Sequence, residues 1–528
     1  MKATLLLLLL ALLLVPRWFF GQGITNNGGR IVSSSGSYWK VSGGFFNFKS
    51  QAKDKTTFNN LAIASGAGIS IDPHSFVTIN GTLNNNGGTS GLILKSDVSG
   101  TASLLHNTAN VDATVERFVS GSTDILDKHY HLVSVPVNSP SYLSEVWLDS
   151  YLFTYLENSN TWKAWSDPVN TILQTKQGAM IFYPFGNSKI YSITGKLNNG
   201  AYTPTIAYSG TNNGYNLVPN PYPSAINWNA SGGWTKNNMS ETIWGFSPAA
   251  RNYGAWNGSV STNSVSNIIP EGQAFFVRAI GSSPVLTMDN AVRLHDFSVF
   301  LKSSNLVPDV LHLLAVGAKG QDEIAIQFAD DATFFHNDIF DAKKFYGSMS
   351  VPQLSTYTNE DESLLSISCI PANGTTVIPL RFEMNYSGQI TFRASGMQSF
   401  QNVTSIQLED KQLAQLTDLG TNPIYQFNYT PADNTDRFVL HFLNATSVAE
   451  PKQAKDFNIY AADGILNIQS LTQQGGKVMV TDMVGRTVAN GRIEAGAATQ
   501  INIQGNTGVY IVSVLTGKGR SNTKVIVR

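Results

Sequence analysis

Short segments with the alternating pattern of β-strands recur along this chain, separated by turns rich in Gly, Asn and Pro. In the stretch from 457 to 528, the runs Lys477–Asp482, Val509–Leu515 and Thr523–Val527 place apolar residues at alternate positions. Several short strands of this kind, with turn residues between them, are typical of a β-sandwich. The pattern predicts an all-β, modular fold that ends in an immunoglobulin-like sandwich at 457–528.

Three motifs in this last stretch resemble the C-terminal sorting domain of type IX secretion substrates. They lie in the family's order at 480–486, 508–512 and 524–528, although Thr481-Asp482-Met483 replaces a more usual aromatic residue and Asn. The residues that carry the resemblance are Asp482, Gly485, Arg486, Gly508, Tyr510, Lys524 and Arg528. The resemblance implies transport across an outer membrane by the type IX machinery, followed by removal of the module by a sortase-like peptidase.

The first 23 residues have the pattern of an export signal. Lys2 precedes an apolar run from Leu5 to Leu14, and Gly21-Gln22-Gly23 offers small residues for cleavage. Pro16 and Arg17 follow the run, which is too short to span a bilayer. We therefore expect a signal peptide at 1–23, no transmembrane segment, and a mature protein that is extracellular or attached to the outer-membrane surface.

Composition narrows the classes of function. Charged residues make up 13% of the chain and the formal net charge is −1, so no charge excess favours binding to nucleic acid. The single cysteine, Cys369, cannot form an intramolecular disulfide. It lies in the apolar run 364–370, where alternation predicts a buried and unreactive side chain.

Segment 24–120 is rich in Gly, Asn and Ser and contains a short repeat. The triplets that begin at Leu61, Ile69 and Val77 follow one another every eight residues, with turn residues between them. A fixed short period predicts a small β-solenoid. An antiparallel meander is the alternative, because Asn80-Gly81 is a hairpin signal.

Segment 121–300 contains seven of the nine tryptophans, and its strands predict a β-sandwich. Tryptophan rings on a β-sheet can stack on sugars, but they more often serve as core residues because each buries a large area. Trp162, Trp165, Trp244 and Trp256 lie in polar, turn-rich contexts, which makes them the candidates for glycan binding.

Segment 301–447 contains seven strand candidates and fits a second, immunoglobulin-like sandwich. The candidates are 312–316, 323–328, 364–370, 376–382, 389–392, 405–408 and 437–442. An acidic loop offers Asp330, Asp331, Asp338 and Asp341 as candidate calcium ligands, although the spacing differs from that of an EF-hand. A polar linker at 448–456 precedes the sorting domain.

The sequence lacks the motifs of common hydrolases and nucleotide enzymes, including Gly-x-Ser-x-Gly and His-Glu-x-x-His. We therefore predict a non-enzymatic, secreted or surface-attached protein with an adhesive or structural role toward a host or matrix surface, and no required cofactor. Two alternatives remain open: a carbohydrate-binding protein that uses the tryptophan-rich sandwich, and an extracellular hydrolase. A hydrolase of glycosides would need two suitably placed carboxylates, whose separation only a structure can show.

Overall fold

The computed structural model describes residues 25–27, 36–49, 56–123, 128–138, 149–164, 177–210, 214–296, 307–329, 332–336, 340–357, 363–371, 376–444, 457–462, 465–471, 475–482, 486–503, 508–516 and 519–527. The predicted signal peptide and the predicted linker lie outside these residues. Contacts divide the chain into two units, Met1–Asn444 and Ala445–Arg528. All the described regular elements are β-strands or 3-10 turns, which confirms the all-β fold class. No helix within the described ranges is long and apolar enough to cross a membrane.

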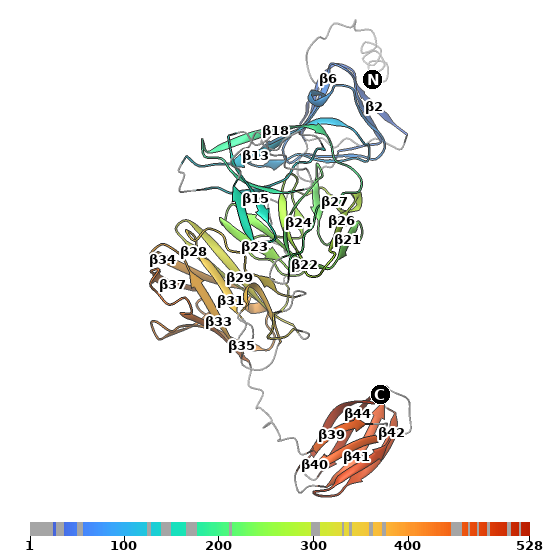
Figure 1. The fold of residues 1–528 in the computed structure, drawn as a ribbon, viewed down its shortest axis with the longest axis vertical. Coiled ribbons are helices and arrows are strands. Elements are labelled where there is room, and N and C mark those ends of the chain that lie inside the picture. The colour runs from blue at the N-terminus through green and yellow to red at the C-terminus, as the bar shows by residue number, and fades with distance from the viewer. Residues whose placement is uncertain are drawn as a thin grey trace, which may run out of the picture. The chain divides into compact units, whose positions relative to one another are not determined.

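The N-terminal part of the first unit is a β-solenoid of three parallel sheets (Figure 1). Its sheets contain β1 (Thr25–Asn27), β3 (Gly44–Lys49), β6 (Ala67–Ile71), β9 (Leu92–Leu94) and β13 (Asp112–Ser120); β2 (Tyr38–Val41), β5 (Asn60–Ile63) and β8 (Leu83–Asn85); and β4 (Thr56–Phe58), β7 (Phe76–Ile79) and β12 (Ser103–Leu105). These solenoid strands pair with their sheet neighbours in parallel. A meander would pair successive strands antiparallel, so the parallel ladders select the solenoid.

The eight-residue repeat in the sequence is the distance along the chain from one strand to the next within a single solenoid coil. Its triplets belong to β5, β6 and β7, which lie in three different sheets. The step along the stack is longer, because Leu61 pairs with Leu83 and Ile69 pairs with Leu92. These steps of 22 and 23 residues correspond to one full coil of three strands.

One coil carries an inserted hairpin. Strands β10 (Ser96–Asp97) and β11 (Gly100–Thr101) pair antiparallel between β9 and β12. The step from Phe76 to its partner Ser103 is therefore 27 residues, whereas the step from Thr56 to Val77 in the same sheet is 21. The stack continues beyond the insertion, since β13 still pairs in parallel with β9.

Four small antiparallel sheets follow the solenoid. Their strands are β14 (His131–Val133), β17 (Ala179–Phe182), β15 (Tyr151–Leu156) and β16 (Thr161–Ala164); β19 (Tyr215–Pro219), β25 (Ala274–Ala279), β22 (Met239–Ser247) and β23 (Asn252–Trp256); β24 (Ile268–Ile269), β20 (Ala225–Asn227) and β27 (Arg293–Leu294); and β21 (Trp234–Asn237) with β26 (Val285–Met288). Strand β18 (Ser188–Lys196) pairs antiparallel with β13 and joins this region to the solenoid. The 3-10 turns are η1 (Thr89–Gly91), η2 (Asn290–Val292) and η3 (Met397–Ser399).

The rest of the first unit is one continuous sheet. In spatial order its strands are β36 (Gln415–Asp418), β35 (Val403–Asp410), β38 (Phe438–Asn444), β33 (Thr376–Glu383), β31 (Gln353–Tyr357), β32 (Leu364–Ile370), β29 (Gly320–Phe328), β28 (Val310–Gly317), β34 (Gly388–Ser395) and β37 (Ile424–Tyr429), with β30 (Ala342–Lys343) beside β32. All seven predicted strands are present. The sheet curls over a shared core, because Phe382 of β33 contacts Phe392 of β34, five places away in the sheet. It differs from the two separate antiparallel sheets of an immunoglobulin fold, and β29 and β32 pair in parallel.

The predicted domain boundary near residue 300 falls between two sheets, but the hydrophobic core continues across it. One buried cluster joins Trp244 and Phe276 from the tryptophan-rich region to Ala325, Ile367 and Cys369 of the large sheet. The two regions therefore pack as parts of one unit, in agreement with the contact division.

The second unit is a seven-stranded sandwich. One sheet contains β39 (Phe457–Ala462), β40 (Ile465–Ser470) and β43 (Ala498–Asn502), and the other contains β42 (Thr487–Ile493), β41 (Gly476–Asp482), β44 (Gly508–Thr516) and β45 (Gly519–Val527). Alternate residues such as Leu466, Val480 and Val512 are fully buried between the sheets.

Candidate functional site

The sorting residues meet at one end of the four-stranded sheet of the second unit. Asp482 ends β41 and pairs with Tyr510 of β44, which in turn pairs with Val525 of β45. Gly508 pairs with Val527, two residues farther along the same ladder. Antiparallel pairing thus brings together three motifs that are separated in the sequence.

In the sorting motif at 480–486, the side chain of Asp482 bonds to Arg486 across the intervening residues. The Asp482 carboxylate accepts hydrogen bonds from the Arg486 backbone N–H at 2.9 Å and from Arg486 Nε at 2.8 Å. The Arg486 side chain is 80% exposed, so it is held in place while remaining open to a partner. Lys524 pairs with Ile511 in the same sheet, whereas Gly485 and Arg528 lie outside the described residues.

The structure places two of the four candidate tryptophans in the core. Trp244 is 2% exposed and donates its indole N–H to the Lys343 carbonyl at 2.9 Å. Trp256 is 6% exposed and bonds to Asn229. Both rings are therefore core residues, the more common role of tryptophan in a β-sheet, because β22 and β23 are covered by neighbouring sheets, and neither is placed to contact a glycan. Trp162 is half-buried, and Trp165 lies outside the described residues.

The candidate calcium loop is not assembled by the residues that can be placed. Asp341 is buried, and its carboxylate accepts a hydrogen bond from the Cys369 backbone N–H at 2.7 Å. Asp330, Asp331 and Asp338 lie outside the described residues. Among the residues that are described, no group of three or more His, Cys, Asp or Glu side chains could hold a metal ion.

Cys369 is buried, as its strand pattern predicts. Its Sγ lies 3.2 Å from the Phe340 carbonyl and receives a long hydrogen bond from Asn257. Burial, reinforced by the nearby Asp341 carboxylate, raises the pKa of the thiol to about 12. The thiolate is therefore strongly disfavoured, and with it a role as a nucleophile.

The first unit has a large open cleft, which we call the aromatic cleft, with a volume of about 1230 Å³. Its aromatic lining includes Tyr130, Phe153, Trp162, Tyr253, Tyr346 and Tyr386. These side chains come from the residue before β14, from β15, β16 and β23, and from loops of the large sheet, so the cleft exists only once the unit has folded. Tyr346 and Tyr386 are 40% and 48% exposed, and both present ring surface to solvent.

The charges that line the aromatic cleft are positive. Lys128, Arg251 and Lys319 contribute to the wall, and no Asp or Glu occurs among its described lining residues. The Lys319 ammonium lies 4.0 Å from the centre of the Tyr386 ring, and Arg251 contacts His129. A wall of aromatic rings and cations suits a ligand with flat apolar faces and negative charge.

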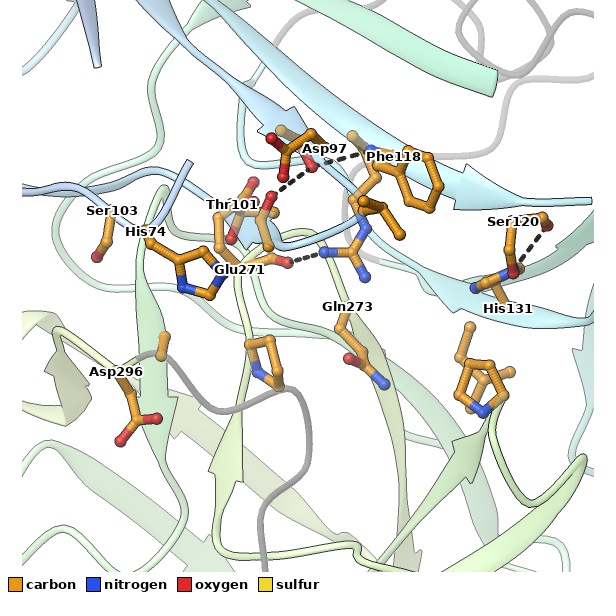
Figure 2. A pocket seen from close by; sticks show the side chains of 18 of the residues that line it. His74, Asp97, Thr101, Ser103, Phe118, Ser120, His131, Glu271, Gln273 and Asp296 are labelled. Atoms are coloured by element: carbon orange, nitrogen blue, oxygen red, sulfur yellow. Dashed lines mark hydrogen bonds between the residues drawn. The ribbon is translucent and has the colours of Figure 1, made fainter. Parts of the chain in front are cut away.

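A second, narrower cavity of about 210 Å³ lies where the inserted hairpin meets the tryptophan-rich region. Figure 2 shows Asp97, His131 and Glu271 around this space, which we call the Glu271 cavity. Glu271 stands in the turn between β24 and β25, followed by Gly272 with a φ of +68°. A side chain at Gly272 would be strained and would lie 3.3 Å from Arg117.

The carboxylate of Glu271 is buried without hydrogen bonds. Glu271 is 3% exposed, and neither of its carboxylate oxygens has a hydrogen-bond partner among the described residues. Arg117 donates from Nη1 to the Glu271 backbone carbonyl at 2.9 Å, while its Nε is likewise unbonded within the described part of the chain. Burial, opposed by the positive charge of Arg117, raises the pKa of Glu271 to about 7.

Other ionisable groups around the Glu271 cavity are shifted as well. Burial and the charge of Arg117 lower the pKa of His131 to about 4, so this ring is neutral at pH 7. Partial burial of Asp97 acts to raise its pKa, but hydrogen bonds from Ser99 hold the pKa below its usual value. Sequence reasoning missed both Glu271 and Arg117. The local signal was a Pro-Glu-Gly turn that ends one residue before the apolar strand β25.

Comparisons with known proteins identify both parts of the chain. Residues 45–442 match a family described as a domain of unknown function, DUF8693. Residues 461–528 match the secretion system C-terminal sorting domain, which confirms the chain as a type IX secretion substrate, exported to the cell surface or the extracellular space. No curated protein matches.

One structural comparison is with PorZ of Porphyromonas gingivalis, described as an essential bacterial surface component of the type IX secretion system. The match has 14% sequence identity and a TM-score of 0.13. It covers 66% of this chain and 55% of PorZ. A similarity of this size carries no argument about fold or function.

Proposed function

The chain belongs to the DUF8693 family and ends in a type IX sorting domain, and from this premise we propose that it is an exported, non-enzymatic protein that binds acidic glycans. The observation that carries the proposal is the aromatic cleft, with cations and no described carboxylate on its wall. The sorting domain accounts for delivery, and the cleft would account for what the delivered protein does.

The aromatic residues favour a saccharide. Trp162 packs edge-on against Tyr155 and Phe276, with ring centroids 5.3 and 5.8 Å apart, so its orientation is fixed before a ligand arrives. Fixed rings lose little conformational entropy on binding. The C–H faces of sugar rings can lie against such surfaces, while their hydroxyl groups bond to the polar rim.

The cations favour an acidic saccharide over a neutral one. Lys128 and Lys319 are exposed, and Arg251 presents a planar guanidinium that suits a carboxylate or sulfate group. Positive walls also attract an anionic polymer over a distance that shrinks as salt is added. Glycoside hydrolysis would need a pair of carboxylates beside the sugar. The described lining of this cleft supplies cations instead, which supports binding.

The test is a binding measurement on the full-length protein with an array of acidic and neutral glycans. We expect selective binding of acidic glycans that weakens as salt increases. Lys319→Glu should lower the affinity on the order of tenfold or more, because it places a negative charge in the cleft. The melting temperature should hardly change, since Lys319 is exposed.

Lys411→Glu is the matched control, because Lys411 is an exposed lysine of the same unit that does not line the cleft. It should bind like the unmodified protein. Equal binding of neutral and acidic glycans, or equal losses in the two lysine variants, would contradict the proposed ligand class. Trp162→Ala should abolish binding, and its melting curve shows whether the loss is local.

A further inference from the structure

The Glu271 cavity has features of a ligand site that the proposed function does not use. Its walls come from the inserted hairpin, from β13 and β14, and from the turn before β25. Apolar side chains make up much of the lining, among them Phe118, Leu132, Phe246 and Pro270. A buried carboxylate in such surroundings, with both oxygens unbonded among the described residues, lowers the free energy of unfolding of the ligand-free protein.

We propose that this cavity binds a small organic cation, an amine with an apolar body, whose ammonium group bonds to Glu271. The ammonium would supply the hydrogen bonds that the carboxylate lacks, and the apolar walls would cover the rest of the molecule. The inference does not rest on the aromatic cleft or on glycan binding.

The charges around the cavity favour a cation. Three carboxylates, those of Asp97, Glu271 and Asp296, line it together with one guanidinium, that of Arg117. His131 lies on the β14 side with a lowered pKa, so it adds no positive charge near neutral pH. His74 lies on the solenoid side. Arg117 is already bonded to the Glu271 carbonyl rather than to its carboxylate, which leaves the carboxylate available.

Size limits the ligand to a small molecule. A volume of about 210 Å³ can hold a compact amine such as benzylamine, but it cannot hold a protein segment or an oligosaccharide. The shared wall residue Phe246 lines both this cavity and the aromatic cleft. The two spaces carry opposite charge, so they select different ligands.

Binding should depend on pH in a defined direction. The pKa of Glu271 is raised to about 7, so the carboxyl is mainly protonated at pH 5.5 and mainly ionised at pH 8. A primary amine stays protonated over this range. An ammonium ligand should therefore bind more weakly at pH 5.5, by roughly tenfold or more.

The experiment uses the full-length protein and ligand-observed NMR titration with benzylamine, with benzyl alcohol as its neutral counterpart. We expect saturable binding of benzylamine at pH 8 and much weaker binding of benzyl alcohol. Glu271→Gln should reduce benzylamine affinity roughly tenfold or more, because a charge-assisted hydrogen bond is lost. Glu241→Gln, an exposed glutamate away from the cavity, is the matched control and should bind normally.

Thermal melting of each variant shows that a loss of binding is not a loss of fold. Three results would overturn the proposal: no saturable benzylamine binding, equal binding of benzylamine and benzyl alcohol, or unchanged affinity in Glu271→Gln. A calcium titration of the same proteins tests whether the carboxylate binds a metal ion instead of an amine. Tight calcium binding that Glu271→Gln removes, without amine binding, would show a metal site in place of the proposed one.

Discussion

Two acid–arginine pairs in the first unit, each with a buried carboxylate, differ in how completely their polar atoms are bonded. Arg437 donates hydrogen bonds to the Asp410 carboxylate from Nε at 2.8 Å and from Nη2 at 2.6 Å. The Tyr425 hydroxyl donates to the same carboxylate. Glu271 is buried beside the half-buried Arg117, but the Glu271 carboxylate has no hydrogen bond within the described residues.

The difference appears in the pKa values. Burial acts to raise the pKa of Asp410, but the bonds from Arg437 and Tyr425 outweigh it and hold the pKa below its usual value. At Glu271, burial outweighs the opposing charge of Arg117 and raises the pKa to about 7. A satisfied pair therefore stabilises one structure, whereas an unsatisfied carboxylate beside a cavity marks a place where another molecule can bind.

The largest expected effect comes from breaking the satisfied pair. Asp410→Asn should destabilise the first unit by about 3–5 kcal/mol, because it removes the carboxylate that Arg437 bonds through two nitrogens and leaves the buried guanidinium only its ion pair with Asp433 at 3.0 Å among the described carboxylates. Chemical denaturation followed by tryptophan fluorescence measures this change, since all described tryptophans lie in that unit. A loss below about 1 kcal/mol would show that the bonding around Asp410 is not what stabilises this region.

A smaller effect, with a characteristic pH dependence, is expected at Glu271. The pKa is 4.5 in the reference state and about 7 when folded, so the folded state holds the proton more tightly between these values. Stability should therefore fall as pH rises from 4.5 to 7, with a maximal slope of about 1.4 kcal/mol per pH unit from this group.

Glu271→Gln should remove that contribution and make the protein more stable than the unmodified chain at pH 7.5, by up to about 3 kcal/mol. Near pH 4 the two proteins should be nearly equal. Parallel stability curves for the two proteins from pH 4.5 to 7.5 would contradict the unsatisfied state of this carboxylate.

The smallest effect is expected at the pair of half-buried Asp482 and exposed Arg486. Arg486→Ala should change the stability of the second unit by less than about 1 kcal/mol, because an ion pair whose cation is solvated gains little over the hydrated ions. Cell fractionation of a strain that carries the variant separates stability from sorting. Impaired surface delivery with an unchanged melting temperature would place the role of Arg486 in recognition, and a large loss of stability would contradict the comparison.

The sequence pattern located most strands because alternation reports directly which face of a strand is buried. All seven strands expected between 312 and 442 form, and Cys369 is buried as alternation predicts. The solenoid was predicted, but the eight-residue spacing did not reveal that three strands make one coil. Coil length depends on which strands pair, and pairing partners are not encoded in local alternation.

The functional features were harder to predict because they depend on tertiary packing. Trp244 and Trp256 have polar, turn-rich neighbours in the sequence, yet neighbouring sheets cover them in the fold. Trp162 is a candidate glycan contact for the same reason, its polar and turn-rich sequence context, and it does line the aromatic cleft. Glu271 was not selected, because nothing in a Pro-Glu-Gly turn shows that distant residues will bury its carboxylate.

The inserted hairpin of β10 and β11 has a consequence for how this protein can be altered. The coils above and below it keep their register, because Ser103 still pairs with Phe76 and Thr114 with Ile93. Ser96 at the base of the hairpin belongs to the stack, because it is buried and its hydroxyl accepts a hydrogen bond from the Phe118 N–H at 3.0 Å. With Ser96 kept, we expect that other loops can be grafted at 97–101 to change the chemistry of the Glu271 cavity while the solenoid keeps its register.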